Sequence, residues 1–450
     1  MTQLNEAIAR YHRLLESEPY KDLGWTEALD ERMRAHHLHS GSRMIAPVLR
    51  PHFITQRQYQ NLTKAAEALY SAINRIEQLA LSTPAFLARM EMLPAEKMLA
   101  SVNPGYSYLA VTSMLDTHLN NGTLRIVGYQ ADTPNGVVYG ETLNNVFWDA
   151  EPMKEFRKKY KLTKIGSTKP LLQSLLKAYK EFGGKKHPNI AILEFRNPFQ
   201  GGDSGEYQLL TEIFRREGFA TQVISPDQLE YRNGVLRKGD FEIHLIYRRV
   251  KVSEFLVRFD LTHPLVRAYR DKAVCVVNSF RSELAQKKAI FDLLTDESIT
   301  GSFPAAERRA IRDFIPWTRV VSATRTMYNN EPVDLLDFIL KNREKLALRP
   351  NDDNGDRNTF QGASMDDAGW ERALKVASRG SYVVQEVTPP ARFTFPVNQY
   401  GRVELQEMQV DVQPHAFLGK VNGCSSWLSA GGSGFSTVSG LAPTYLLEGK

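Results

Sequence analysis

The sequence predicts an α/β protein, built from mixed helices and strands, with a helical N-terminal region. Three observations lead to this fold class. Apolar residues recur at helical spacing in the first hundred residues, buried strands alternate with helices between about 188 and 280, and short strands continue toward the end of the chain. Alternating strands and helices indicate a mainly parallel sheet, with ligands near the carboxyl ends of its strands. At 450 residues the chain is too long for one small core.

The composition is that of an ordinary globular protein, with 42% hydrophobic and 24% charged residues. The net charge of +6 is mild and no long block of like charges appears, so we expect no nucleic-acid partner. No apolar run approaches the ~20 residues that a bilayer span needs, and residues 1–6 do not begin a signal peptide. Cys275 and Cys424 give no disulfide framework. We therefore expect a cytoplasmic protein without a membrane partner.

The first region, residues 1–104, reads as helical. Thr55 is a suitable helix N-cap, and Gln58 completes a capping box. Apolar residues then recur at helical spacing, which predicts one amphipathic helix packed on a core. These residues are Leu62, Ala65, Ala66, Leu69, Ile73 and Ile76. The histidine-rich segment 36–39 favours a surface turn over a metal site, because adjacent side chains point in different directions.

The next two regions we expect at 105–187 and 188–280. In the first, residues 124–130 predict a strand, and a helix near 168–182 has Thr168 as its cap and Gly183 as its stop. In the second, a helical apolar face spans 209–214. Its strands are expected at 190–193, 221–224, 241–247 and 273–277, and the last of them leads to Asn278 and a helix that holds Lys287 and Lys288. Arg248 and Arg249 follow a buried strand, which favours anion binding, and we take them as catalytic candidates.

The last region, residues 281–450, contains several segments whose order along the chain suits nucleotide binding. A strand near 346–349 ends in Arg349 and runs into the polar turn 351–357, and a strand at 382–387 follows a short helix. The arginine would meet phosphates, the turn would cover them, and the second strand would offer backbone groups to an adenine edge. The alternative is that Arg349 is a surface residue at a strand end.

A strand at 403–412 alternates between two faces. Val410 and Val412 lie on one face, and Gln409 and Asp411 on the other. An acidic strand face could hold Mg²⁺ beside phosphates, because Mg²⁺ takes oxygen ligands and usually shares one or two carboxylates with a nucleotide. A solvated outer face is the alternative, and the sequence leaves both open.

Taken in order, these segments resemble the circularly permuted ATP-grasp proteins, the group that includes glutathionylspermidine synthase and is related in fold to eukaryotic glutathione synthetase. The resemblance covers roughly residues 105–450. Its carriers are the segments 122–134, 240–249, 278–288, 348–350 and 382–386. It implies that 105–187 is a permuted part of the ATP-grasp domain, 188–280 a pre-ATP-grasp-like domain, and 281–450 the main ATP-grasp part.

The resemblance also implies an activity and its cofactors, ATP and Mg²⁺. The expected reaction activates a carboxylate as an acyl phosphate and couples it to an amine, so the partners would be a small-molecule carboxylate and an amine or peptide. Lys288 and Arg349 match the two basic positions that hold ATP phosphates. Gln385 and Glu386 match the hinge beside adenine, and Gly355 is the glycine retained in the covering loop.

The metal positions are where this chain departs from the family. Asp116 matches an acidic metal ligand, and Asp411 is a looser candidate facing the nucleotide. The family's Glu-x-Asn falls here on Gly128 and Gln130: glycine supplies no carboxylate, while glutamine keeps an oxygen ligand. Two further departures are Met114, where the family often has arginine, and Arg349, where it has lysine.

The departures leave two interpretations open. Loss of one preorganised electrostatic group commonly costs ~10²–10³ in rate, so a working ligase would need a nearby acid such as Asp132 or Glu141 to replace the missing ligand. Otherwise the chain is a catalytically impaired scaffold that binds a nucleotide or a protein, since fold does not fix function.

Overall fold

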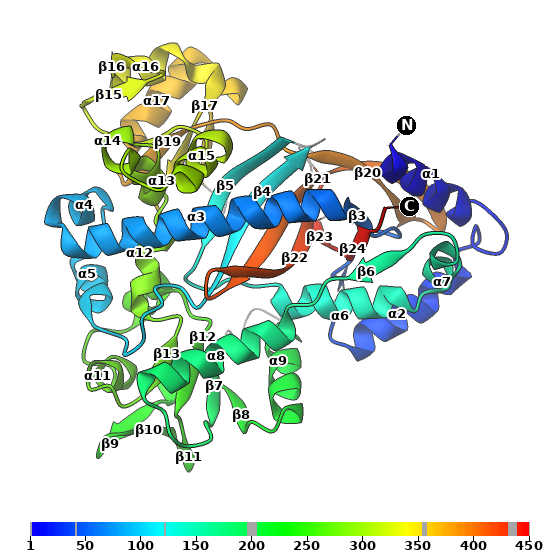
Figure 1. Ribbon diagram of the computed structural model, residues 1–450, viewed down its shortest axis with the longest axis horizontal. Helices are drawn as coiled ribbons and strands as arrows, with labels where there is room; N and C mark the ends of the chain where they lie inside the picture. The colour runs from blue at the N-terminus through cyan, green and yellow to red at the C-terminus, as the bar shows by residue number, and fades with distance from the viewer. Residues whose placement is uncertain are drawn as a thin grey trace.

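The computed structural model describes residues 2–40, 43–120, 123–195, 205–352, 358–430 and 439–449. Three sheets of the described chain have four or more strands, and Figure 1 shows the long helix α3 (Gln56–Ser82) crossing in front of the largest one. The two ends of the chain lie close together, where the Gln3 side-chain amide donates to the Glu448 carbonyl at 3.2 Å. None of the described helices combines the length and apolarity that a membrane crossing requires.

The largest sheet joins segments from opposite ends of the sequence. Its strand order is β23-β22-β21-β4-β5, with β20 paired to β21, and the pairings are antiparallel. The strands are β4 (Thr112–Asn120), β5 (Thr123–Gln130), β20 (Arg392–Gln399), β21 (Arg402–Phe417), β22 (Lys420–Ser429) and β23 (Ser439–Ala442). Val412 of β21 pairs with Thr117 of β4, so residues nearly 300 positions apart become neighbours.

Helix α3 covers one face of this sheet and confirms the predicted capping box. The Gln58 N–H donates to the Thr55 hydroxyl at 3.2 Å, and the Thr55 N–H donates to Gln58 Oε1 at 2.9 Å. Leu62 and Ala65 of the helix share one buried cluster with the apolar face of β21. The other face of β21, with Gln409, Asp411 and Gln413, therefore points away from α3.

The predicted parallel sheet is present, with order β13-β12-β7-β8. Its strands are β7 (Ile190–Leu193), β8 (Thr221–Ile224), β12 (Leu245–Arg248) and β13 (Cys275–Val277), with helix α9 (Gly205–Arg216) between β7 and β8. The single strand expected at 241–247 was wrong. β11 (Phe241–Glu242) pairs with β10 (Val235–Lys238) in a separate small sheet, and the chain crosses to the parallel sheet at His244, whose N–H donates to the Asn189 carbonyl.

The third sheet has the order β14-β19-β17-β18 and is antiparallel. Its strands are β14 (Thr318–Val320), β17 (Leu346–Pro350), β18 (Phe360–Gln361) and β19 (Tyr382–Glu386). Leu348 and Val384 pack in a buried cluster with helices α16 (Leu335–Lys341) and α17 (Asp367–Ala377). Because strand side chains alternate, Arg349 and Gln385 lie on the opposite face.

Two helix boundaries differ from the sequence expectation. Lys287 and Lys288 were expected inside one helix, but they lie between α12 (Glu283–Gln286) and α13 (Ala289–Leu294), because Lys287 has extended backbone (ψ 130°). Thr168 begins α8 (Thr168–Phe182) instead of capping it. The cap is the carboxylate of Glu141, which accepts the N–H groups of Ser167 (2.8 Å) and Thr168 (2.7 Å). A negative charge at a helix N-terminus is favourable.

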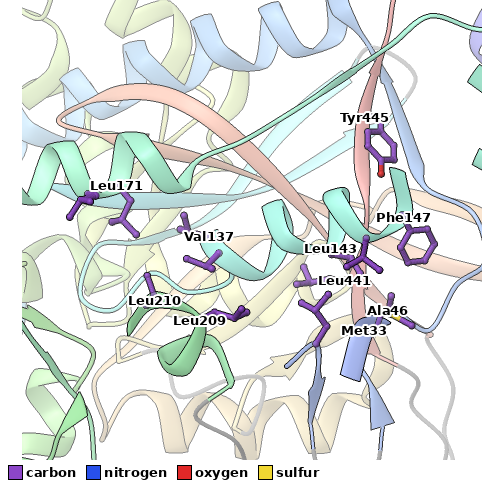
Figure 2. Packing of buried hydrophobic residues seen from close by; sticks show 14 of the residues in the cluster. Met33, Ala46, Val137, Leu143, Phe147, Leu171, Leu209, Leu210, Leu441 and Tyr445 are labelled. Atoms are coloured by element: carbon purple, nitrogen blue, oxygen red, sulfur yellow. The ribbon is translucent and has the colours of Figure 1, made fainter. Parts of the chain in front are cut away.

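The largest buried cluster lies where several elements meet below the big sheet. Figure 2 shows side chains of α2 (Gly24–Ala35), α6 (Val137–Trp148), α8 and α9 packed with those of β23 and β24 (Thr444–Leu447). The N-terminal helices therefore share a core with the rest of the chain. The histidines of 36–39 belong to no group of close metal-binding side chains among the described residues.

Two buried histidines make folding stability depend on pH. Burial lowers the pKa of His52 and of His415 to about 3. Between about pH 6.5 and pH 3 the unfolded chain binds protons that the folded chain does not, so stability falls as pH falls. Each histidine contributes up to about 1.4 kcal/mol per pH unit.

The free energy of unfolding, measured by urea denaturation, should fall between about pH 7 and pH 5. We expect this fall to be smaller in His415→Gln than in the wild type. His36 is exposed, so His36→Gln should show the same fall in unfolding free energy as the wild type. An equal fall in the wild type, His415→Gln and His36→Gln would contradict the prediction.

Candidate functional site

Three neighbouring strands bring polar side chains together around Asp116. Gln130 of β5 donates its amide Nε2 to Asp116 Oδ1 at 2.9 Å, and Gln413 of β21 donates its own to the same oxygen at 2.7 Å. Burial raises the pKa of Asp116 above its ordinary value, although the Gln130 amide and the Lys288 charge act to lower it. We call Asp116, Gln130 and Gln413 the Asp116 site.

Gly128 lies directly opposite Asp116 in the β4–β5 register. A Cβ atom at Gly128 would come within 2.4 Å of Asp116 Oδ2, which is closer than real Cβ contacts. The carboxylate of Asp116 therefore fills the space that a side chain at 128 would need. This accounts sterically for the glycine where the family pattern has glutamate.

Adding a side chain at 128 should therefore destabilise the fold. We expect Gly128→Ala to lower the free energy of unfolding by about 1–3 kcal/mol, because Asp116 must leave its two amide donors or the strands must shift. Urea denaturation measures this change. Gly24→Ala is the control, since a Cβ there meets only Asp22, at ordinary distances of 3.7 and 3.9 Å. If Gly128→Ala has the same free energy of unfolding as the control, the Asp116 carboxylate does not exclude a side chain at position 128.

Arg349 connects the third sheet to the Asp116 site. Its Nη1 donates to the Val127 carbonyl of β5 at 3.1 Å and to Gln385 Oε1 at 3.0 Å. Val127 is next to Gly128, so the guanidinium lies near the position where Asp116 meets β5. Both of its hydrogen bonds to described residues use Nη1, which leaves Nε and Nη2 as donors for an anion.

Lys288 reaches the same neighbourhood from the start of α13. Its N–H donates to the Asn351 carbonyl at 3.0 Å, and Asn351 Oδ1 accepts the Ala289 N–H at 2.8 Å. These bonds fix the residues after Arg349 against the lysine. The Lys288 charge acts on Asp116, so the two lie within electrostatic reach of each other. Gly355 lies outside the described residues.

Asp411 lies on the same face of β21 as Gln413. Its Oδ1 is 3.2 Å from His118 Nε2, and Gln409 Nε2 donates to it at 3.3 Å. The Asp411 charge also acts to raise the pKa of Asp116, so the two carboxylates are close enough to repel. This strand face therefore adjoins Asp116 and is not a uniformly solvated surface.

The two hinge residues are already bonded within their sheet. Gln385 is buried, and its Nε2 donates to the Thr318 hydroxyl at 3.0 Å. The Glu386 N–H donates to the Trp317 carbonyl at 3.0 Å, and the Val387 N–H to the Lys345 carbonyl at 2.8 Å. These backbone donors, which the strand would offer to an adenine edge, are therefore paired with the carbonyls of residues that directly precede β14 and β17.

Arg248 and Arg249 are buried and bonded to the chain. Arg248 donates to the carbonyls of Asn278 (3.0 Å) and Val250 (2.6 Å) and forms an ion pair with Asp132. Arg249 donates to the Pro134 carbonyl and lies 3.8 Å from Glu206. Asp132 is thus held by Arg248, and Glu141 by the N-terminus of α8, so both acids suggested as replacement metal ligands serve other contacts.

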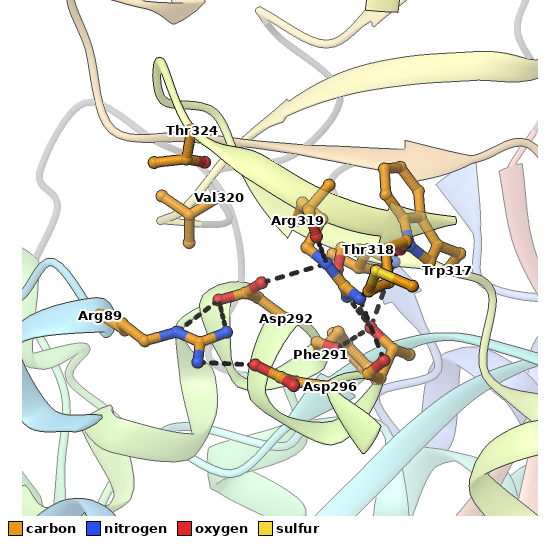
Figure 3. Close-up of polar contacts among 12 residues, drawn as sticks. Arg89, Phe291, Asp292, Asp296, Trp317, Thr318, Arg319, Val320 and Thr324 are labelled. Carbon is orange, nitrogen blue, oxygen red and sulfur yellow. Dashed lines mark hydrogen bonds and ion pairs between the residues drawn. The ribbon is translucent and has the colours of Figure 1, made fainter. Parts of the chain in front are cut away.

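Sequence reasoning missed a cavity of about 1450 Å³ beside β14. It lies among α13, α14 (Glu297–Thr300), α15 (Ala305–Phe314) and β15 (Arg325–Tyr328). Of the predicted site residues that the structure describes, Glu386 alone is in its lining. Figure 3 shows its polar wall, where Arg89 contacts Asp292 and Asp296 at 2.8 Å each. Nothing local in the sequence pairs Arg89 with carboxylates about two hundred residues away.

A second missed cluster surrounds Lys287. Its ammonium is 1% exposed and forms ion pairs with Glu96 (3.0 Å), Glu283 (3.1 Å) and Asp352. Asp352 lies in the predicted covering turn 351–357, and Glu96 lies in the N-terminal helix α5 (Pro94–Ser101). Lys287 therefore links Asp352 to the helical N-terminal region, while the charge of its neighbour Lys288 acts on Asp116.

Comparison with solved structures identifies the fold. A glutathione synthetase-like effector from Globodera pallida, in its apo form, superposes with a TM-score of 0.59 at 13% identity, over 94% of this chain and 96% of that one. The chain has a glutathione synthetase-like fold. This confirms the fold class expected from the sequence, that of the ATP-grasp resemblance. At this identity the likeness shows the fold alone, so activity must be argued from the residues.

Two further structures are less similar. A proposed gamma-glutamylcysteine synthetase from Methylobacillus flagellatus has a TM-score of 0.43 at 11% identity, over 88% of this chain and 87% of that one. The ATP-grasp ligase PsnB, complexed with its minimal precursor, has a TM-score of 0.29 at 12% identity, over 58% of this chain and 90% of that one. Neither a protein-family model nor a curated protein matches the chain.

Proposed function

We propose that this protein binds ATP with Mg²⁺ and uses it to couple a small-molecule carboxylate to an amine or peptide. One observation carries the proposal: Arg349 and Asp116 come from distant segments and meet the middle of β5, and the charge of Lys288, from a third segment, acts on Asp116. Two cations and a carboxylate gathered in this way suit a triphosphate and its metal ion. The glutathione synthetase-like fold supports it.

In this proposal the two basic side chains bind the phosphates, Arg349 through Nε and Nη2 and Lys288 through its ammonium. Arg248 and Arg249 act as positioning residues, because they hold the segments around Asn278 and Pro134 beside the site. Gln385 orients Arg349 by accepting from its Nη1. Glu386 lies at the strand end where the adenine would be expected.

The residues around Asp116 fit a Mg²⁺ ion. Mg²⁺ binds oxygen ligands and needs only one or two protein carboxylates when phosphates supply the rest, and Asp116 and Asp411 provide two. Gln130 and Gln413 each place a side-chain amide against Asp116, and amide oxygens are further ligands that Mg²⁺ accepts. The ion would neutralise phosphate charge when bound.

The activity is tested by incubating the protein with ATP, Mg²⁺ and pools of carboxylates and amines, and measuring release of ADP and phosphate. We expect release that requires both a carboxylate and an amine and that falls sharply in Arg349→Ala. Measurable ATP binding without release from any pool would contradict the ligase assignment.

A second candidate is a nucleotide-binding module without catalysis. It is favoured by the filled space at Gly128 and by the paired N–H groups of Glu386 and Val387. Calorimetry distinguishes the two candidates. ATP binding that does not change when Mg²⁺ is removed supports the module, and strong dependence on Mg²⁺ supports the ligase.

A further inference from the structure

We propose that Gln413 is a metal ligand that takes the place of the carboxylate absent at Gly128. The inference rests on the proposed nucleotide function and adds a residue from β21 to the cation site. Gln413 is only 7% exposed, and its Nε2 contacts Asp116 Oδ1 at 2.7 Å. Its Oε1 has no partner within the described ranges. In this orientation the contact with Asp116 is made by Nε2 and not by Oε1.

A half-turn of the amide explains how this oxygen reaches the ion. Rotation about the last side-chain bond exchanges Nε2 and Oε1, which have nearly the same shape. Gln413 and Gln130 both direct Nε2 toward Asp116. With a cation on the carboxylate the amide donors are no longer needed there, and the rotated amides present oxygens instead. Three oxygen ligands would then come from three adjacent strands.

The other acids near the site are held elsewhere. Asp132 is paired with Arg248, and Glu141 caps α8. A side chain at 128 would overlap Asp116, so β5 cannot supply the missing ligand from that position. Gln413 approaches Asp116 from the strand on the opposite side of β4, where no such overlap arises.

The test uses Mn²⁺ as a spectroscopic probe on the full chain in the presence of ATP. Electron paramagnetic resonance measures free Mn²⁺, and calorimetry without metal measures ATP binding separately. We expect Gln413→Ala to weaken Mn²⁺ binding at least tenfold while metal-free ATP binding is retained. Gln413→Glu, which adds a carboxylate, should bind Mn²⁺ more tightly than the wild type. Gln406→Ala, earlier on the same strand, should match the wild type.

The outcomes separate this inference from the proposed function. Wild-type Mn²⁺ affinity in Gln413→Ala overturns the ligand role, even if ATP binding is normal. If the alanine variant does not fold, Gln413→Glu decides, and unchanged or weaker Mn²⁺ binding overturns the role. Wild-type protein that binds ATP but no Mn²⁺ also overturns it. A protein that binds no ATP at all contradicts the proposed function itself.

Discussion

We expect an Arg349→Ala variant to bind ATP roughly 10- to 100-fold more weakly than the wild type. The expected loss follows from removing charge-assisted hydrogen bonds, which contribute about 1.5–3 kcal/mol each, and about 1.4 kcal/mol corresponds to a factor of ten. The substitution also removes the contact between the third sheet and the Val127 carbonyl. Calorimetric titration with ATP and Mg²⁺ measures the change.

Two matched variants locate the effect. Arg349→Lys keeps a cation at the position where the resembled family has lysine, so we expect affinity near that of the wild type. Arg325→Ala removes an exposed arginine from the lining of the cavity beside β14 and should leave ATP binding unchanged. The opposite pattern, with Arg325→Ala defective and Arg349→Ala normal, would place the nucleotide in that cavity.

Lys287→Met should lower the free energy of unfolding by about 3–5 kcal/mol, the usual cost of removing one partner from a buried ion pair. The substitution leaves Glu96, Glu283 and Asp352 close together without their shared cation. Burial already raises the pKa of Glu283 well above its ordinary value. A raised carboxyl pKa means that protonation favours the folded state, so the deficit should shrink as pH falls. Urea denaturation at neutral and mildly acidic pH measures both effects.

Two further proteins serve as controls for this prediction. Lys375→Met alters an exposed lysine of α17 and should change stability by no more than about 0.5 kcal/mol. Combining Lys287→Met with Glu283→Gln removes one uncompensated charge and should recover part of the loss, since the two residues are in contact. A Lys287→Met protein as stable as the Lys375→Met protein would contradict the role of this cluster.

Patterns within the sequence were enough to predict features set by local rules. The capping box of Thr55 and Gln58 fixed the start of α3, because the two side chains need only a three-residue spacing. The short apolar run 190–193 located β7, because residues of a central strand in a parallel sheet are buried on both faces. The resemblance to ATP-grasp proteins supplied the fold class, which the glutathione synthetase-like neighbour confirms.

Contacts between distant segments were beyond local patterns. Gln413 and Asp116 are 297 positions apart, and no periodicity in either strand indicates that β21 lies beside β4. The prediction of a helix through Lys287 was wrong. The residues around it favour a helix locally, but Lys287 has extended backbone and forms ion pairs with distant acidic residues. The cavity beside β14 escaped prediction for the same reason, since Arg89 faces α13 only in the folded chain.

The central claim is that Asp116, Lys288 and Arg349 surround one triphosphate. A crystal structure of the full chain with Mg²⁺ and a non-hydrolysable ATP analogue tests it most directly. The account predicts phosphate oxygens within hydrogen-bond distance of Arg349 and Lys288, and a metal ion on Asp116. Nucleotide bound instead in the cavity lined by Arg89, Arg319 and α15, with Asp116 still holding both glutamine amides, would contradict it.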